Sequence, residues 1–213
     1  AAFANNGQGV RGDMRAVIRA VLLDPEARAA DNGGGGLGNI RGKVREPMLR
    51  LVAMARAMEV GDPGTVVFPV ADLSNASYGV GQAPLKSPSV FNFFRPGYLP
   101  AGTAIAAANL VAPEFQLANE TSVAGYLNFM QTVTSSNHSD LRPDYSAELA
   151  LAPNAAALVA RVETLLAAGQ LGSDARSAIV AAVDSIPAGT GAANRVATAV
   201  MLVMASPDYL VQK

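Results

Sequence analysis

The sequence predicts a mainly α fold: an irregular helical bundle with a long Pro/Gly/Phe-rich loop region and a C-terminal three-helix unit. Apolar residues recur at intervals of three and four over several segments, as they do on one face of an α-helix. Capping residues, glycines and prolines bound these segments. Residues 61–118 instead concentrate proline, glycine and phenylalanine without a sustained helical period, so we expect them to be irregular.

The N-terminal segment, residues 1–60, is predicted to hold two helices joined by a glycine-rich loop at residues 31–39. The first helix follows Gly12 and Asp13, and the second begins near Glu46 and Pro47, where proline suits a first turn. The apolar faces are expected to comprise Met14, Val17, Ile18, Val21 and Leu22 in the first helix, and Met48, Leu51, Val52, Ala55 and Met58 in the second. In the irregular segment, short strand or single-turn pieces are expected at residues 65–70 and 105–111.

Residues 119–213 are predicted to form a C-terminal helical bundle. A helix should start at Asn119 and Glu120, with Val123, Tyr126, Leu127, Met130 and Val133 on one face. Three more helices are expected between residues 153 and 206: one closed by Gly169 at its C′ position, one with Ser173 as N-cap, and a last one at residues 192–205. The last is apolar almost all round, so we expect it at the centre of the bundle. We expect all three segments to form one compact domain.

The composition narrows the classes of function. Sixteen basic and seventeen acidic residues give a net charge of -1, which favours neither nucleic acid nor an anionic membrane surface as partner. The chain has no cysteine, which excludes disulfides, thiolate nucleophiles and iron–sulfur clusters. The longest strongly apolar run, residues 196–205, is about half of what a membrane-spanning helix needs. No membrane span is therefore predicted.

Two motifs of enzyme chemistry are incomplete. The glycine-rich loop leads to Gly42 and Lys43, but Leu37 replaces the first glycine of a phosphate-binding P-loop and Val44 replaces its hydroxyl residue. The single histidine, His138, cannot build a triad or a multi-imidazole zinc site within the chain. We expect it in a surface loop, although it could serve as one ligand of a site completed elsewhere. The sequence predicts no metal site, and it identifies neither a cofactor nor catalytic residues.

The carboxylates match no calcium loop and no acid/base pair. Asp140 and Asp144 suit turns, Glu148 suits a solvated face, and Glu120 suits a helix N-terminus. An alternative is a carboxylate and amide cluster that binds a cation or a sugar, formed by Glu114, Asn119, Glu120 and Asn128.

The most unusual segment is residues 87–98, where three phenylalanines, a tyrosine and an arginine lie among prolines. Such rings and a guanidinium plane can form a stacking surface for sugars, aromatic ligands or proline-rich peptides. The candidate binding residues here are Asn92, Phe94, Arg95 and Tyr98. The alternative, which the general burial of large rings favours, is that the rings anchor the loop on the helices while Arg95 pairs internally.

These residues also carry a family resemblance. The segment at residues 82–98 reads QAPLKSPSVFNFFRPGY and resembles the bacterial domain-of-unknown-function 1800 family. Similar strings lie elsewhere: GDM at 12–14, LLDPEAR at 22–28, REP at 45–47, APEFQ at 112–116 and SPDYLVQ at 206–212. The resemblance covers essentially the whole chain.

The resemblance implies an exported bacterial protein, placed in the cell envelope, the periplasm or outside the cell. It also implies that this chain is the C-terminal part of a larger protein, in keeping with its start at Ala1 rather than methionine. The family has no assigned catalytic residues to carry over. We therefore expect a structural or interaction module whose partner is the N-terminal part of the same protein or another protein. The alternatives are part of a hydrolytic or carbohydrate-directed enzyme completed by that N-terminal part, and a ligand- or peptide-binding module that uses residues 87–98.

Overall fold

The computed structural model describes residues 1–25, 42–61, 72–138 and 140–212, and these residues form two compact units. The first unit is Ala1–Gly42 and the second is Lys43–Gln212. The expected loop at residues 31–39 and the expected strand or turn at residues 65–70 lie outside the described residues. The fold is mainly α, as predicted, and its described strands are two residues long each.

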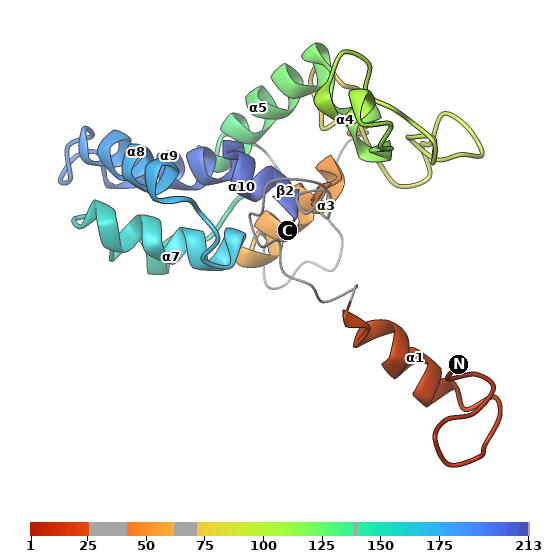
Figure 1. Ribbon diagram of the computed structural model, residues 1–213. Coiled ribbons are helices and arrows are strands. Elements are labelled where there is room, and N and C mark those ends of the chain that lie inside the picture. The colour runs from red at the N-terminus through yellow and green to blue at the C-terminus, as the bar shows by residue number, and fades with distance from the viewer. Residues whose placement is uncertain (26–41, 62–71, 139, 213) are drawn as a thin grey trace. The chain divides into compact units, whose positions relative to one another are not determined.

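Helix α1 (Met14–Leu22) lies in the first unit, where the apolar periodicity predicts it (Figure 1). The Asp13 side chain caps it by accepting hydrogen bonds from the backbone N–H groups of Arg15 and Ala16 at 3.0 and 3.2 Å. Asn6 donates from its side chain to the other oxygen of Asp13 at 2.8 Å. This bond, followed by the backbone bonds, holds the pKa of Asp13 below its usual value. The start of the helix is thus fixed by residues that precede it.

The second unit contains the remaining elements, and Figure 1 shows their arrangement. Its longer helices are α3 (Pro47–Ala57), α5 (Glu120–Thr134), α7 (Ala155–Ala167), α8 (Ser173–Asp184) and α9 (Ala192–Ala205). Its short helices are α4 (Ala104–Ala107), η2 (Pro113–Leu117), α6 (Ser146–Leu149) and α10 (Pro207–Leu210), of which η2 is a 3₁₀ helix. Strands β1 (Lys43–Val44) and β2 (Val211–Gln212) pair antiparallel, with Lys43 opposite Gln212. Helix α4 is the single turn expected near residue 105.

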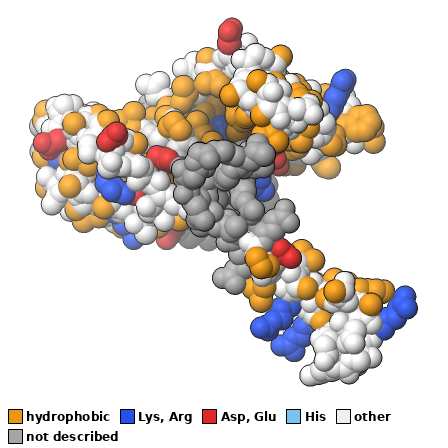
Figure 2. All heavy atoms as spheres, in the orientation of Figure 1, with side chains coloured by type: hydrophobic (Ala, Val, Ile, Leu, Met, Phe, Trp, Pro, Cys, Tyr) orange, Lys and Arg blue, Asp and Glu red, His pale blue; other side chains and the backbone are white. Residues whose placement is uncertain are grey.

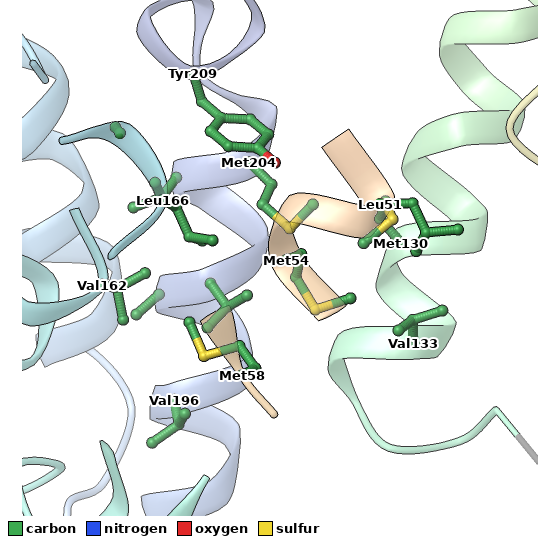
Figure 3. Close-up of a cluster of buried hydrophobic side chains, with 14 of the residues drawn as sticks. Leu51, Met54, Met58, Met130, Val133, Val162, Leu166, Val196, Met204 and Tyr209 are labelled. Atoms are coloured by element: carbon green, nitrogen blue, oxygen red, sulfur yellow. The ribbon is translucent and has the colours of Figure 1, made fainter. Parts of the chain in front are cut away.

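Helix α9 lies at the centre of the second unit, as its apolar composition predicts. It packs against α5, α6, α7, α8 and α10, and α7 and α8 also pack against each other, which confirms the C-terminal three-helix unit. Val196, Ala199, Val200, Val203 and Met204 of α9 are all fully buried. Figure 3 shows α3 between α9 and α5, with Met54 and Met58 reaching into the same core. Burial of this apolar surface is the main stabilising term of the fold.

Arg195 is the one charged side chain that α9 buries. Its Nε donates to the carbonyl of Ile186 at 2.7 Å, and its Nη1 donates to the carbonyl of Ala152 at 2.8 Å. Its Nη2 donates to the carbonyl and the carboxylate of Asp184, at 3.1 and 2.8 Å. Arg195 therefore ties the end of α8 and the loop before α7 to the central helix, and these acceptors satisfy the buried guanidinium.

A second ion pair with one buried partner, Glu163, joins α7 to α8. Arg176 donates two hydrogen bonds to the buried carboxylate of Glu163, at 2.7 and 2.6 Å. The backbone N–H of Leu171 donates to the same carboxylate at 3.2 Å. The Arg176 bonds hold the pKa of Glu163 below its usual value. Gly169, with φ of +75°, occupies the position after the C-cap of α7 as predicted.

Four sequence expectations about individual residues are wrong. Val52 and Val123 are exposed, because α3 turns Arg50, Leu51 and Met54 inward and α5 turns Gly125, Tyr126 and Phe129 inward. Ser173 is the first residue of α8 and not its N-cap, which is Gly172; the Gly172 N–H donates to Asp208 at 3.0 Å. Glu148 is buried rather than solvated, because Arg161 pairs with it at 3.1 Å. Apolarity alone does not predict these inward faces, because buried charged side chains and close backbone contacts also decide which residues face the core.

Gly125 permits one of those close contacts. A Cβ at this position would lie 1.9 Å from the carbonyl oxygen of Ala76. Such a contact is far inside the van der Waals limit, so α5 can approach the Ala76 segment only with glycine at this point.

We expect Arg195→Met to lower the free energy of unfolding by about 3 kcal/mol, because several carbonyl groups lose a charged donor in a buried place. The measurement is urea denaturation followed by circular dichroism. Arg56→Met, on the exposed side of α3, is the control and should change stability by less than about 0.5 kcal/mol. Equal losses in both variants would contradict the tying role of Arg195.

We expect Gly125→Ala to destabilise the protein by about 1–3 kcal/mol through overpacking, although alanine is the better helix former by about 1 kcal/mol. Thermal unfolding monitored at 222 nm measures the effect. Gly189→Ala is the matched control, because a Cβ there meets no atom within 4 Å. A stabilised Gly125→Ala variant would show that the contact with Ala76 does not constrain α5.

Candidate functional site

The candidate binding residues lie on two adjoining segments of the second unit. The backbone N–H of Arg95 donates to Oε1 of Gln116 at 2.8 Å, and the N–H of Ala112 donates to the carbonyl of Tyr98 at 2.9 Å. These bonds anchor residues 87–98, which we call the aromatic loop, on the segment that contains η2. Figure 1 shows this loop as the yellow-green part of the chain that extends away from α5.

The aromatic loop is only partly buried. Asn92 and Arg95 are exposed, whereas Phe94 and Tyr98 are half-buried. The neighbouring apolar residues are far more open: Leu85, Val90 and Phe91 are 103%, 93% and 60% exposed. The alternative in which all the rings plug the loop into the helices is therefore wrong for Phe91, because the core closes without it.

A tight turn at Ser89–Asn92 sets the tip of this loop. The N–H of Asn92 donates to the carbonyl of Ser89 at 3.1 Å, and the N–H of Phe91 donates to the Ser89 hydroxyl at 3.2 Å. Asn92 has φ of +67°, a left-handed conformation that asparagine tolerates better than most residues. Val90 and Phe91 therefore occupy the two central positions of a hydrogen-bonded turn. The sequence candidates included Asn92 but missed these two residues.

Of the residues proposed for the carboxylate and amide cluster, Asn119 holds local structure. The Asn119 side chain accepts from the N–H of Ser122 at 2.9 Å, and the Ser122 hydroxyl accepts from the N–H of Asn119 at 2.9 Å. This capping box starts α5, as the sequence predicts, and Glu120 lies exposed in its first turn. Glu114 is half-buried in the first turn of η2, and Asn128 is exposed on α5.

His138 also holds local structure. Its Nδ1 accepts hydrogen bonds from the N–H groups of Asp140 and Leu141, both at 3.2 Å. Its ring packs edge-on against Phe129, with 5.6 Å between the ring centroids. Asp144, expected in a turn, accepts from the N–H of Ser146 at 2.8 Å. Among the residues that the structure describes, no three His, Asp or Glu side chains are grouped so as to hold a metal ion.

The strings at 45–47, 82–98 and 206–212 meet at the start of α3. The Gln82 side chain donates to Glu46 and accepts from the N–H of Met48 at 3.1 Å. The N–H of Arg45 donates to the carbonyl of Leu210 at 2.8 Å, next to the β1–β2 pair. Three segments that are distant in sequence thus contact one another at the start of α3.

Two arginines and two tyrosines fill this junction. The Arg45 guanidinium carbon lies 5.0 Å from the centre of the Tyr209 ring, and that of Arg50 lies 4.8 Å from the centre of the Tyr126 ring. The Tyr209 hydroxyl donates to the carbonyl of Arg50 at 2.8 Å, and Arg50 Nε donates to the carbonyl of Arg45 at 2.7 Å. We call these four residues the arginine–tyrosine junction. Stacking on the rings offsets part of the cost of burying Arg50.

In the second unit, the strings at 45–47, 82–98 and 206–212 therefore meet at one junction, and the string at 112–116 anchors the loop next to it. The model of a family of proteins of unknown function, DUF1800, matches residues 1–211. The chain belongs to the DUF1800 family. No curated protein and no solved structure matched it.

For this DUF1800 chain, family membership assigns no reaction. In the described parts of the chain, no helix has both the length and the apolar character needed to cross a bilayer, in agreement with the sequence. The strings at 45–47 and 206–212 contribute buried structural contacts, whereas the string at 82–98 runs from the junction, at Gln82, to the exposed turn. Of the strings that carry the resemblance in the second unit, the one at 82–98 is where described large apolar side chains, Leu85, Val90 and Phe91, are exposed.

Burial raises the pKa of Tyr126 to about 12, with Arg50 opposing the shift, and burial likewise raises the pKa of Tyr209. A raised pKa means that the folded state holds the proton more tightly than the unfolded state does. The stabilising contribution is therefore complete below about pH 10 and is lost as the pH rises from about 10 towards 12. We expect urea unfolding measured across this range to show a falling free energy of unfolding. Tyr126→Phe and Tyr209→Phe should each make the fall shallower, and Tyr78→Phe, at an exposed position, should not.

Proposed function

We propose that this chain is a protein-interaction module that uses the aromatic loop as its contact surface. The observation that carries the proposal is the turn at Ser89–Asn92, which holds Val90 and Phe91 in solvent by two hydrogen bonds, one to the carbonyl and one to the hydroxyl of Ser89. Large apolar side chains on an ordered turn are unfavourable in water. Covering them with a partner lowers the free energy.

The anchoring of the loop favours binding. The Gln116 bond to Arg95 and the Ala112 bond to Tyr98 fix one end of the loop, and the ion pair between Lys86 and Asp72, at 3.3 Å, lies at the other. A preformed turn loses little conformational entropy when it docks, so more of the contact energy appears as affinity. An aromatic side chain at the tip is the residue type that dominates binding energy in protein interfaces.

The partner that suits this tip is a protein with an apolar pocket about the size of two side chains, rimmed by polar groups that can meet Asn92 and Arg95. The chain is nearly neutral, so apolar contact rather than net charge would drive association. In keeping with the family resemblance, we propose that this complex forms in the bacterial cell envelope and that the chain acts there as part of an exported protein.

The test is capture of partners from an extract of the source organism, with the unaltered chain and Val90→Ser/Phe91→Ser compared as immobilised baits. The altered turn should lose at least tenfold of the captured partner, because two apolar anchors are removed. Thermal unfolding should be unchanged, since both side chains lie outside the core.

Val111→Ser is the matched control, because Val111 is also apolar and exposed in the second unit. This variant should capture the partner as the unaltered chain does. Identical capture by all three baits would exclude the turn as the contact surface.

A further inference from the structure

The first unit carries an apolar helix face that no described residue of that unit covers. Met14, Ile18, Val21 and Leu22 of α1 are each more than half exposed, and no residue of α1 is buried. Figure 2 shows hydrophobic and basic side chains gathered over the segment that carries α1. Each longer helix of the second unit, in contrast, buries its apolar residues at least in part.

The spacing of this face is that of a helix that inserts into a groove. Met14, Val17, Ile18 and Val21 stand at positions i, i+3, i+4 and i+7, the anchor pattern by which amphipathic helices bind grooves on other proteins. The cap at Asp13 and its bond from Asn6 already fix the first turn. A helix of nine residues is marginal by itself, so burying its apolar face would stabilise the helix as well as the complex.

The charges of α1 indicate what surrounds such a groove. Arg15 and Arg19 lie four residues apart and, at 100° per residue, fall together on one flank of the apolar stripe. The helix contains no acidic residue, and the carboxylate of Asp13 is already engaged as the cap. Any carboxylate that pairs with the arginine flank therefore comes from outside the helix.

Two other occupants fit less well. A second copy of α1 would bring arginines but no acidic side chain to meet Arg15 and Arg19. A lipid surface is served better by amphipathic helices much longer than nine residues, because binding scales with the apolar area buried.

We propose that α1 is a docking helix, which inserts Met14, Val17, Ile18 and Val21 into an apolar groove of a partner protein whose rim presents carboxylates to Arg15 and Arg19. This surface is separate from the aromatic loop, so the proposal goes beyond the proposed function and does not depend on it. It adds a second contact with its own chemistry: an apolar groove with an acidic rim.

The experiment places a photo-cross-linking amino acid, benzoylphenylalanine, at Ile18 of the full chain in living cells of the source organism. The matched control carries the probe at Ala20, which is exposed on the opposite face of α1. The Ile18 probe should cross-link to one partner protein, at residues that line an apolar groove bordered by Asp or Glu. The Ala20 probe should give little product.

Charge variants then separate this mode from simple hydrophobic contact. Arg15→Gln/Arg19→Gln should reduce the Ile18 cross-link about tenfold, because both rim pairs are lost, whereas Arg15→Lys/Arg19→Lys should retain it. Val90→Ser/Phe91→Ser should leave the Ile18 cross-link intact, so that failure of the docking helix and failure of the aromatic loop are told apart.

Four outcomes would overturn the proposal. They are a cross-link to a second copy, cross-links confined to the chain's own residues, an Ile18 product that the glutamine variants leave unchanged, and equal products from both probe positions. Flotation of the purified chain with vesicles of phosphatidylcholine and phosphatidylserine in equal parts provides a further check. Co-flotation that Ile18→Ser abolishes would assign α1 to a lipid surface instead.

Discussion

The second unit depends on the burial of α9. A helix that is apolar around almost its whole circumference is stable only where other elements surround it, and five helices do so here. The same burial makes its one inward charge a constraint, because a guanidinium out of water must find acceptors. Arg195 finds them in carbonyl groups at the end of α8 and just before the start of α7, so the charge ties these two places to the central helix.

The arginine–tyrosine junction extends this core to the parts of the chain that are far from it in sequence. Tyr209 follows α9 directly and donates to the carbonyl of Arg50 in α3, while Arg50 stacks on Tyr126 of α5. Gln82 binds the start of α3 and opens the string that leads into the aromatic loop. A packed junction beside the start of this string would suit the contact surface that we propose, because a preformed turn loses little conformational entropy on binding.

Apolar periodicity and capping residues predicted the positions of the helices closely. Asp13, Pro47 and Asn119 mark helix starts as the sequence predicts, and α9 spans the residues expected of it. The periodicity did not predict all the residues that face the core. Val52 and Val123 are apolar yet exposed, and Arg50 is charged yet buried, since the face is chosen by what lies opposite and not by hydrophobicity alone. Of the candidate site, the aromatic loop was located from its composition. Val90 and Phe91 were missed because rings and β-branched chains are usually buried.

The sequence by itself determined the helical class, most helix boundaries, the central place of the last long helix and the family to which the chain belongs, because these depend on local spacing and on residue identity. The tertiary structure alone decided that Arg50, Glu148, Glu163 and Arg195 are buried. It also decided that the Ala76 backbone packs against Gly125, and that a turn holds Val90 and Phe91 in water. Each of these depends on partners brought together from distant parts of the chain, and no local pattern of residues specifies which partners will meet.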